Sequence, residues 1–366
     1  MKILYIDHIS PNGHVNFNKI HLQALLSLKH DIYCIFKKDY LRKINIENII
    51  IYKEIPLCLY KNNTNGFIER VFYLLQLLFI KFNAKFSTFD FVIFAAYEPI
   101  SLFFAKIKTP TFLINHNTIS GLDKSRLKEF FTKKISKKNI HLVFDKHMQK
   151  RLEKSKIFKS KIIPHGYCMP FTNNLNSLYI DSLNEMDHRI YKSEYSIIFC
   201  PSSTSIDKEF VFQIITNERF NNFLFENKII LLIKGNYNCN FSFNKNIISI
   251  NRFLTDIEYQ FLLKLSKVII LPYGKDFKYR TSGIMFECFS NNIPCLISNI
   301  ASMRTYSAHF NYNPYFNNIS DLQFKILTVL NEIKYPHIYL QIDKLNPLIH
   351  WSYILKNNFF YEPDKK

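Results

Sequence analysis

Residues 269–299 read IILPYGKDFKYRTSGIMFECFSNNIPCLISN, and this stretch decides the fold. It begins inside an apolar strand over Val268–Leu271, passes through a polar loop to a helical run that starts near Ser282, and ends with a second apolar strand over Cys295–Ile297. The order strand, loop, helix and strand is typical of a parallel sheet with helices on its faces. The stretch therefore predicts an α/β protein.

The start of this helix is suited to an anion. Ser282 and Gly283 present free backbone N–H groups and the positive end of the helix dipole. Glu287 follows Gly283 by four residues and so lies on the same face, about 6 Å further along the axis. A diphosphate at the helix start and sugar hydroxyls on the carboxylate fit a nucleotide-sugar. An N-cap beside a surface glutamate is the alternative.

The length, composition and net charge of the chain limit the classes of protein to which it can belong. Its 366 residues are 48% hydrophobic and 16% aromatic, which predicts two domains with substantial cores. Lys and Arg number 48 against 29 Asp and Glu, for a net charge of +19. This charge favours nucleotide phosphates, an anionic membrane surface or nucleic acid as partners, although Lys-rich composition alone is an alternative. The lysines are spread rather than blocked, which disfavours nucleic acid.

The location of the protein is predicted from its apolar runs and cysteines. The run VFYLLQLLFI over 71–80 is too short to span a bilayer, and the N-terminus reaches Asp7 before a signal-peptide core can form. The seven cysteines are scattered, which predicts reduced thiols. We expect a cytoplasmic protein that visits the inner face of the plasma membrane. The apolar helix Phe67–Lys81 either packs in the core or docks on an anionic leaflet.

Apolar runs alternate with amphipathic stretches along the whole chain, and the polar piece 172–191 predicts the connection between the domains. The expected strands are Ile3–Ile6, Asp31–Phe36, Phe91–Ala95, Thr111–Asn115, His141–Phe144, Lys161–Ile163, Ser196–Cys200, Lys228–Ile233, Ile247–Ile250, Val268–Leu271 and Cys295–Ile297. The expected helices are Asn18–Lys29, Phe67–Lys81, Pro99–Ile107, Lys124–Ser136, Lys146–Lys156, Lys208–Thr216, Asp256–Lys264, Gly283–Ser290 and Ser320–Ile333.

Four further residues are candidates for the site. Gly13, in the loop after the first strand, lets backbone approach a ligand, but the full GxGxxG of dinucleotide folds is missing. His116 ends a strand, where a histidine either has a structural role or orients a reacting group. Lys208 at a helix start indicates a compensating anion or a solvated lysine. Arg280 is either a second phosphate contact or a surface arginine.

Several motifs are missing from the sequence. It contains no Asp-x-Asp, so the metal–diphosphate clamp of other nucleotide-sugar enzymes has no candidate, and we expect no metal and no cofactor. It also lacks GxxxxGK[ST], GxSxG, HExxH and zinc-type Cys/His spacing.

Four segments together resemble the GT-B glycosyltransferases, in particular family 4, also called glycosyl transferases group 1. They are IIPHGY (Ile162–Tyr167), FLTDIEYQFLLKLSKVIILPY (Phe253–Tyr273), RTSGIMFECFSNNIPCLISN (Arg280–Asn299) and His-Trp-Ser (His350–Ser352). The resemblance covers most of the chain.

The resemblance implies two Rossmann-like parallel-sheet domains that face each other across a cleft. It places an acceptor-binding domain at 1–170, a nucleotide-sugar-binding domain at 171–345, and a C-terminal helix and tail at 346–366 that cross back to the first domain. Glu287 matches the family's ribose-binding carboxylate, and Ser282 and Gly283 match its diphosphate-binding helix start. Lys208 matches the family's basic residue after the first strand of the second domain. His116 matches its histidine near the transferring sugar, and Gly13 matches its glycine loop near the diphosphate.

One position departs from the family pattern. The pattern E-x7-E places its first glutamate at position 279, where this chain has Tyr279, and the nearest acid is Asp276. The first glutamate normally addresses the donor sugar, so the sugar and the retention of configuration stay undetermined, as do the nucleobase, the acceptor, the linkage and the oligomeric state.

The function expected from these features is a metal-independent glycosyltransferase. It moves a sugar from a nucleotide-diphosphate-sugar to a hydroxyl of a glycan or lipid-linked glycan, in the assembly of a bacterial surface polysaccharide such as capsule or lipopolysaccharide. The alternatives are a nucleotide-sugar epimerase on the same architecture, a catalytically silent scaffold, and a basic nucleic-acid-binding protein.

Overall fold

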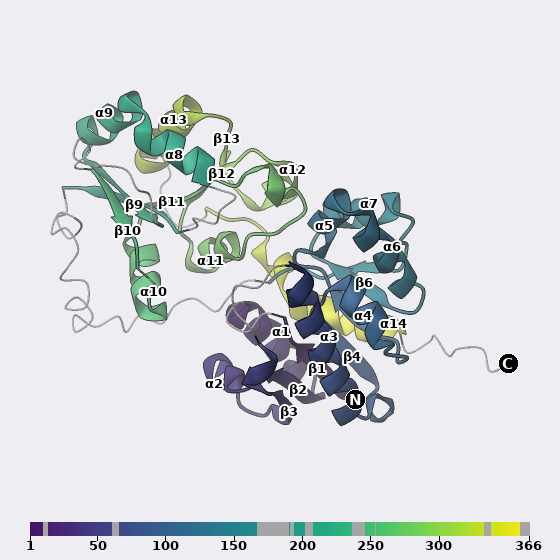
Figure 1. Ribbon diagram of the computed structural model, residues 1–366. Coiled ribbons are helices and arrows are strands. Elements are labelled where there is room, and N and C mark those ends of the chain that lie inside the picture. The colour runs from purple at the N-terminus through teal and green to yellow at the C-terminus, as the bar shows by residue number, and fades with distance from the viewer. Residues whose placement is uncertain are drawn as a thin grey trace. The chain divides into compact units, whose positions relative to one another are not determined.

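The computed structural model describes residues 1–9, 14–60, 66–166, 190, 194–201, 208–235, 246–252, 254–332 and 338–358. The chain divides into two compact units (Figure 1). Unit 1 comprises Met1–Cys168, Tyr279–Thr281 and Asp343–Lys366, and unit 2 comprises Met169–Lys278 and Ser282–Ile342.

Unit 1 contains a parallel sheet of seven strands in the order β3-β2-β1-β4-β5-β6-β7. The strands are β1 Lys2–Asp7, β2 Asp31–Lys37, β3 Ile50–Ile55, β4 Phe91–Ala96, β5 Phe112–Ile114, β6 Ile140–Val143 and β7 Ser160–Ile162. The inner strands are apolar along their length because both faces of the sheet are covered. In β1, Ile3 and Tyr5 face one core, and Leu4 and Ile6 face the other.

Helices cover both faces of this sheet. α3 Gly66–Asn83, α4 Pro99–Ala105 and α6 Arg126–Ile135 contribute to the core that contains Leu4 and Ile6. The opposite core takes α1 Val15–Ser27, α2 Tyr40–Ile44, α5 Thr118–Lys124, α7 Lys146–Lys154 and α14 Pro347–Asn358. Short 3₁₀ turns occur at Leu57–Leu59, Phe86–Thr88 and Ile342–Leu345.

The last helix, α14, packs on α1 inside unit 1. Trp351 is fully buried, and its Nε1 donates a hydrogen bond to Nδ1 of His21 at 3.0 Å. Since Nδ1 accepts, Nε2 of His21 carries the proton, and this N–H donates a hydrogen bond to the carbonyl of His165 at 3.1 Å. The predicted return of the C-terminal helix to the first domain is confirmed.

Unit 2 contains six parallel strands in the order β10-β9-β8-β11-β12-β13. They are β8 Ser196–Cys200, β9 Ile229–Lys234, β10 Ile247–Ile250, β11 Val268–Leu271, β12 Cys295–Ser298 and β13 Tyr315–Phe316. The helices are α8 Lys208–Thr216, α9 Glu218–Glu226, α10 Asp256–Leu265, α11 Gly283–Asn291, α12 Ala301–Arg304 and α13 Ile319–Glu332, with 3₁₀ turns at Lys275–Phe277 and Ser307–His309.

The prediction of two parallel-sheet, Rossmann-like domains is confirmed. The sequence did not indicate two strands, β3 and β13, and both lie at a sheet edge. In β3 most side chains are exposed or half-buried, so it lacks the continuous apolar pattern of an inner strand. The expected helix Lys124–Ser136 is present as α6, which begins two residues later because Ser125 has extended backbone and caps it. The short helix α5 before it was not predicted.

Gly166 provides a test of the packing of α14. Its φ is +84°, and a Cβ there would lie 2.7 Å from Cγ of Pro347 and 2.9 Å from Cγ2 of Ile20. Gly166→Ala is therefore expected to lower the free energy of unfolding by at least about 1–2 kcal/mol. Gly66→Ala is the control, since a Cβ at Gly66 meets no atom within 4 Å. Equal stability of the two variants in chemical denaturation would contradict this packing.

Candidate functional site

The predicted anion site lies where β11 ends and α11 begins. Ser282 is the N-cap of α11, and its hydroxyl accepts a hydrogen bond from the backbone N–H of Met285 at 3.0 Å. The same hydroxyl is hydrogen-bonded to the hydroxyl of Tyr273, the second residue after β11. The side chain of Ser282 is buried and committed to the protein, so an anion would meet backbone amides here rather than this hydroxyl.

Two such amides remain at the helix start. In the part of the chain that the structure describes, the N–H groups of Gly283 and Ile284 donate no hydrogen bond to protein. Both residues are half-buried rather than sealed in the core. The first turn of a helix ordinarily leaves such donors for a ligand, a cap or water. The cap of Ser282 uses the next donor, Met285, and leaves these two available.

Glu287 lies one turn further along α11 and is held in place from α10. It is 8% exposed, and its Oε2 accepts a hydrogen bond from the hydroxyl of Tyr259 at 2.6 Å. Burial, and then the negative charge of Glu287, raise the pKa of Tyr259 well above its ordinary value, so the phenol stays a donor. The predicted pair of helix start and carboxylate is therefore present on one helix, with its carboxylate oriented.

Tyr279 and Arg280 precede this helix but group with unit 1. Tyr279 is buried and stacks on His147 of α7, with ring centroids 4.9 Å apart, and the guanidinium of Arg151 lies 6.0 Å from its ring centroid. The position where the family pattern has a glutamate thus carries a packing residue. Arg280 is half-buried.

Two predicted site residues, Gly13 and Lys208, lie wholly or partly outside the described residues. Gly13 lies outside the described residues, as does the loop 202–207 before α8. Lys208 is the first residue of α8, as predicted, but its side chain is outside the described part. The carboxylate of Asp276 is outside it as well.

His116 follows β5 in unit 1 and belongs to a buried cluster of rings. Its ring stacks on His14 at a centroid distance of 3.9 Å and meets Phe17 edge-on at 4.3 Å and Phe144 at 5.0 Å. His14 begins α1 with a φ of 60°, a strained conformation for a histidine. Its Nδ1 lies 3.9 Å from the carboxylate of Asp7, at the end of β1.

The protonation state of His116 follows from this burial. Desolvation, and then the neighbouring His14, His165 and His21, hold its pKa well below the ordinary value, so the ring is neutral at pH 7. The ring is hydrogen-bonded to the backbone of Ala95, and its buried Nε2 has no partner in the part of the chain that the structure describes. Nδ1 is therefore the atom that bonds to Ala95, and Nε2 is left as a hydrogen-bond acceptor.

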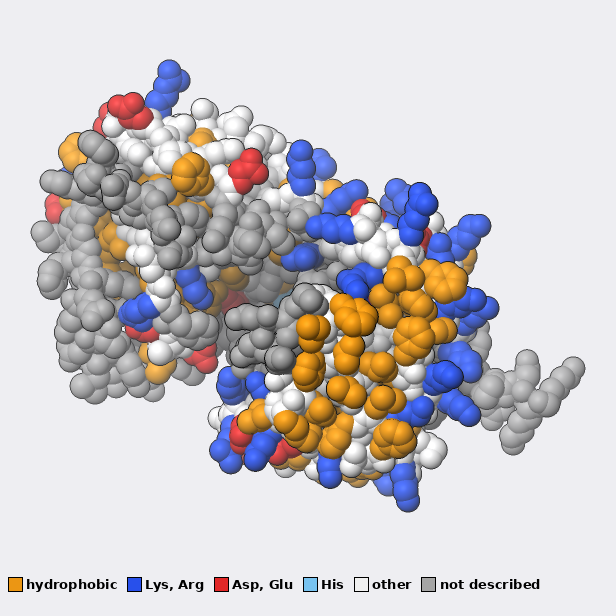
Figure 2. Space-filling model, viewed as in Figure 1, with side chains coloured by type: hydrophobic (Ala, Val, Ile, Leu, Met, Phe, Trp, Pro, Cys, Tyr) orange, Lys and Arg blue, Asp and Glu red, His pale blue; other side chains and the backbone are white. Residues whose placement is uncertain are grey.

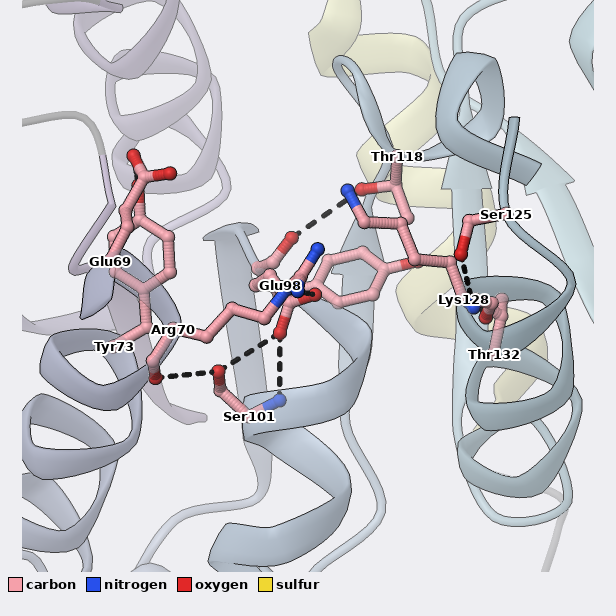
Figure 3. Close-up of polar contacts among 10 residues, drawn as sticks. Glu69, Arg70, Tyr73, Glu98, Ser101, Thr118, Ser125, Lys128 and Thr132 are labelled. Atoms are coloured by element: carbon pink, nitrogen blue, oxygen red, sulfur yellow. Dashed lines mark hydrogen bonds and ion pairs between the residues drawn. The ribbon is translucent and has the colours of Figure 1, made fainter. Parts of the chain in front are cut away.

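A second polar cluster, which the sequence analysis did not identify, lies after β4. Glu98 caps α4: its Oε2 accepts from the backbone N–H of Ser101 at 2.8 Å and from its hydroxyl at 2.9 Å. Its Oε1 lies 3.5 Å from Nε of Arg70 in α3 and has no hydrogen-bond partner within the described ranges. Figure 3 shows Arg70 and Ser101 reaching Glu98 from the two helices. The same hydroxyl of Ser101 lies 3.0 Å from the carbonyl oxygen of Arg70, so its one proton is shared between two acceptors and ties α4 to α3.

A buried histidine lies near Tyr73 of α3. His8, directly after β1, is fully buried, and neither of its ring nitrogens has a hydrogen-bond partner among the described residues. Its ring lies 6.3 Å from that of Tyr73, whose hydroxyl donates to Glu69 at 2.6 Å. Burial lowers the pKa of His8 to about 3. The sequence did contain a signal for Glu98. It follows an apolar strand in FVIFAAYE, and a position after a strand is what identified His116.

Among the described residues, no three His, Cys, Asp or Glu side chains are placed to hold a metal ion. The candidate groups described above are backbone amides and Glu287 in unit 2, and Glu98, Arg70 and His116 in unit 1.

No protein-family model matches the chain, and no curated protein matches it at a significant level. Solved structures do match it. UDP-GlcNAc 2-epimerase from Neisseria meningitidis, bound to UDP-GlcNAc, has a TM-score of 0.59 at 14% identity and covers 98% of this chain and 100% of its own. The chain has a GT-B-like fold.

Two other matching structures are not named as UDP-GlcNAc 2-epimerases. Anabaena Alr3699/HepE in complex with UDP and glucose gives a TM-score of 0.64 at 10% identity, over 97% of this chain and 99% of its own. The UDP-forming α,α-trehalose-phosphate synthase from Burkholderia xenovorans gives 0.57 at 9% identity, over 97% and 95%. At these identities the likeness establishes the fold.

The buried histidines of unit 1 make its stability depend on pH. Burial lowers the pKa from 6.5 to about 3 for His8 and His21, and to about 4 for His141 and His165. Between the folded pKa values and the unfolded pKa of about 6.5, these histidines are protonated in the unfolded chain but not in the folded chain. The free energy of unfolding therefore falls as the pH drops from about 6.5 towards 4. Each histidine contributes up to about 1.4 kcal/mol per pH unit.

Chemical denaturation at about pH 7.5 and about pH 5.5 measures this effect, and His8→Leu should reduce the dependence by roughly one proton. Equal stability at the two pH values would show that these rings are not held neutral.

Proposed function

We propose that this chain binds a nucleoside-diphosphate sugar on α11 and transfers the sugar to an acceptor hydroxyl. The observation that carries the proposal is the pair of uncommitted amides at Gly283 and Ile284, with the oriented carboxylate of Glu287 one turn away. The diphosphate would accept hydrogen bonds from the amides and lie at the positive end of the helix dipole, and the ribose hydroxyls would donate hydrogen bonds to Glu287. Open α/β sheets bind ligands at this carboxyl edge.

The chemistry of transfer places its main demand on the leaving group. Negative charge develops on the departing diphosphate, so donors already aimed at it lower the barrier. Lys208 at the start of α8, Arg280 and the Gly13 loop are proposed as further contacts to the diphosphate, on the basis of the family resemblance. None of these roles requires a metal ion.

The acceptor is proposed to bind to unit 1. Oε1 of Glu98 is a buried carboxylate oxygen whose nearest cation is Arg70, and it is suited to accept a hydrogen bond from a sugar hydroxyl. His116, neutral at Nε2, can accept a hydrogen bond from a sugar but is not a proton carrier at pH 7. A glycan or lipid-linked glycan of a bacterial surface polysaccharide is the proposed acceptor class.

A nucleotide-sugar epimerase is the second candidate, and the structural neighbours favour it. Several of them are UDP-GlcNAc 2-epimerases, including those from Neisseria meningitidis and Methanocaldococcus jannaschii. An epimerase uses the same nucleotide site but changes a stereocentre of the bound sugar and needs no acceptor. The nucleotide site on α11 is therefore common to both candidates.

Gly283 allows a test that removes one amide from this site. Proline is tolerated at the first position of a helix, and Ser282 before it has φ −87° and ψ 114°, which suit a residue preceding proline. Gly283→Pro deletes the N–H, whereas the control Gly283→Ala keeps it. Loss of one charge-assisted hydrogen bond should weaken nucleoside-diphosphate binding by about 10- to 150-fold relative to the alanine variant. Equal dissociation constants by calorimetry would remove the amide from the site.

Incubation with donors separates the two candidates. UDP-, GDP-, ADP- and CMP-sugars are first screened by calorimetry, and each sugar that binds is then incubated with and without glycan acceptors. Mass spectrometry and NMR of the products should show transfer only when an acceptor is present. Conversion of the donor to its epimer without an acceptor would establish the second candidate, and a chain that binds none of the sugars would contradict both.

A further inference from the structure

The outward face of α3 is apolar, which is unusual for a helix on the surface of a domain. Phe67, Val71, Leu75 and Phe82 are exposed and recur at spacings of four and seven residues, which places them along one side of the helix. Phe67 is 73% exposed and Phe82 is 81% exposed. The outer face of a surface helix is ordinarily polar.

Two neighbouring helices extend this apolar face. α4 packs against both α3 and α6, and Phe104 of α4 and Leu127 and Phe130 of α6 are each more than half exposed. Phe131 of α6 lies 5.5 Å from Phe104 and 5.3 Å from Phe130, measured between ring centroids, so the side chains form one surface. Figure 2 shows apolar side chains gathered over this part of unit 1. We call it the α3–α4–α6 face.

Basic side chains border the α3–α4–α6 face. The segments 66–83, 99–108 and 126–138, which contain these three helices, carry ten Lys or Arg against two acidic residues, Glu69 and Glu129. Figure 2 shows Lys and Arg along the edge of the apolar area, and the ammonium of Lys134 lies 5.2 Å from the ring centroid of Phe130. The exposed basic residues of these segments are Lys106, Lys108, Arg126, Lys133, Lys134, Lys137 and Lys138.

We propose that the α3–α4–α6 face docks on an anionic membrane surface. Apolar and aromatic side chains flanked by lysines match the boundary between acyl chains and anionic headgroups, where the rings enter and the ammonium groups meet phosphate. Among the described helices, none is long and apolar enough to cross a membrane, so the face would lie on the bilayer. A second copy of the chain fits less well, because a two-fold contact would bring the same basic rims together.

The docking would be held by two separable forces. Each phenylalanine that enters the interface contributes through its buried apolar area, and loss of one weakens partition by about tenfold or more. Each lysine near an anionic surface contributes about fivefold, and salt screens this part. Binding should therefore fall when either set is removed and when neutral lipid replaces anionic lipid.

Vesicle co-sedimentation tests the proposal with the full chain. The probe is phosphatidylcholine vesicles with about 30 mol% phosphatidylglycerol, compared with pure phosphatidylcholine. We expect binding to the anionic vesicles alone, with a loss of about a hundredfold for Phe67→Ser with Phe82→Ser. The matched control is Phe225→Ser with Phe324→Ser, which removes phenylalanines of unit 2 that are 73% and 69% exposed and should bind like wild type.

Charge is tested with a second pair of variants. Lys134→Glu with Lys138→Glu should reduce binding by about 25-fold or more, whereas Lys228→Glu with Lys267→Glu changes the net charge equally in unit 2 and should have a smaller effect. Equal binding of the face variants and their controls, or no binding of wild type to anionic vesicles, would overturn the proposal.

Sedimentation velocity without lipid covers the remaining outcome. A dimer that Phe67→Ser with Phe82→Ser dissociates would assign the α3–α4–α6 face to a second copy instead of a membrane. None of these measurements involves a nucleotide, so they can fail while the proposed function stands, and the proposed function can fail while they succeed.

Discussion

The parallel arrangement of both sheets is the constraint on which the rest of the structure depends. A parallel sheet must bury both faces, so its inner strands are apolar along their length and polar side chains collect where the strands end. Asp7 ends β1 and His8 follows it, Glu98 follows β4, His116 follows β5 and Tyr273 follows β11. The carboxyl ends of parallel strands meet at one edge of their sheet, so residues distant in the sequence are brought together there. The same constraint accounts for the buried, uncharged His8 and His116.

The core of the nucleotide-site prediction could be made from the sequence because its determinants are local. Ser282, Gly283 and Glu287 lie within six residues, and helix periodicity alone places the carboxylate one turn from the helix start. The inner strands were equally readable from their apolar runs. The orientation of Glu287 was not, because its partner Tyr259 lies on another helix and no pattern of spacing links the two.

The rest required the fold, because it depends on contacts between distant residues. Arg70 and Glu98 are 28 positions apart, and only the packing of α3 on α4 shows that they form an ion pair. At position 279 the sequence showed a missing glutamate, whereas the structure shows a tyrosine packed on His147. The apolar helix Phe67–Lys81 left packing in the core and docking on an anionic leaflet open. The structure shows one side of it packed in the core and Phe67, Val71 and Leu75 exposed.

The proposed function depends on one nucleotide binding along α11. A crystal structure of the chain with a nucleoside diphosphate, UDP first, tests it most directly. It should show phosphate oxygens within hydrogen-bond distance of the amides of Gly283 and Ile284, and ribose hydroxyls on the carboxylate of Glu287 while Tyr259 still holds its Oε2. A nucleotide bound elsewhere, or bound with Glu287 making no contact to it, would contradict the proposed function.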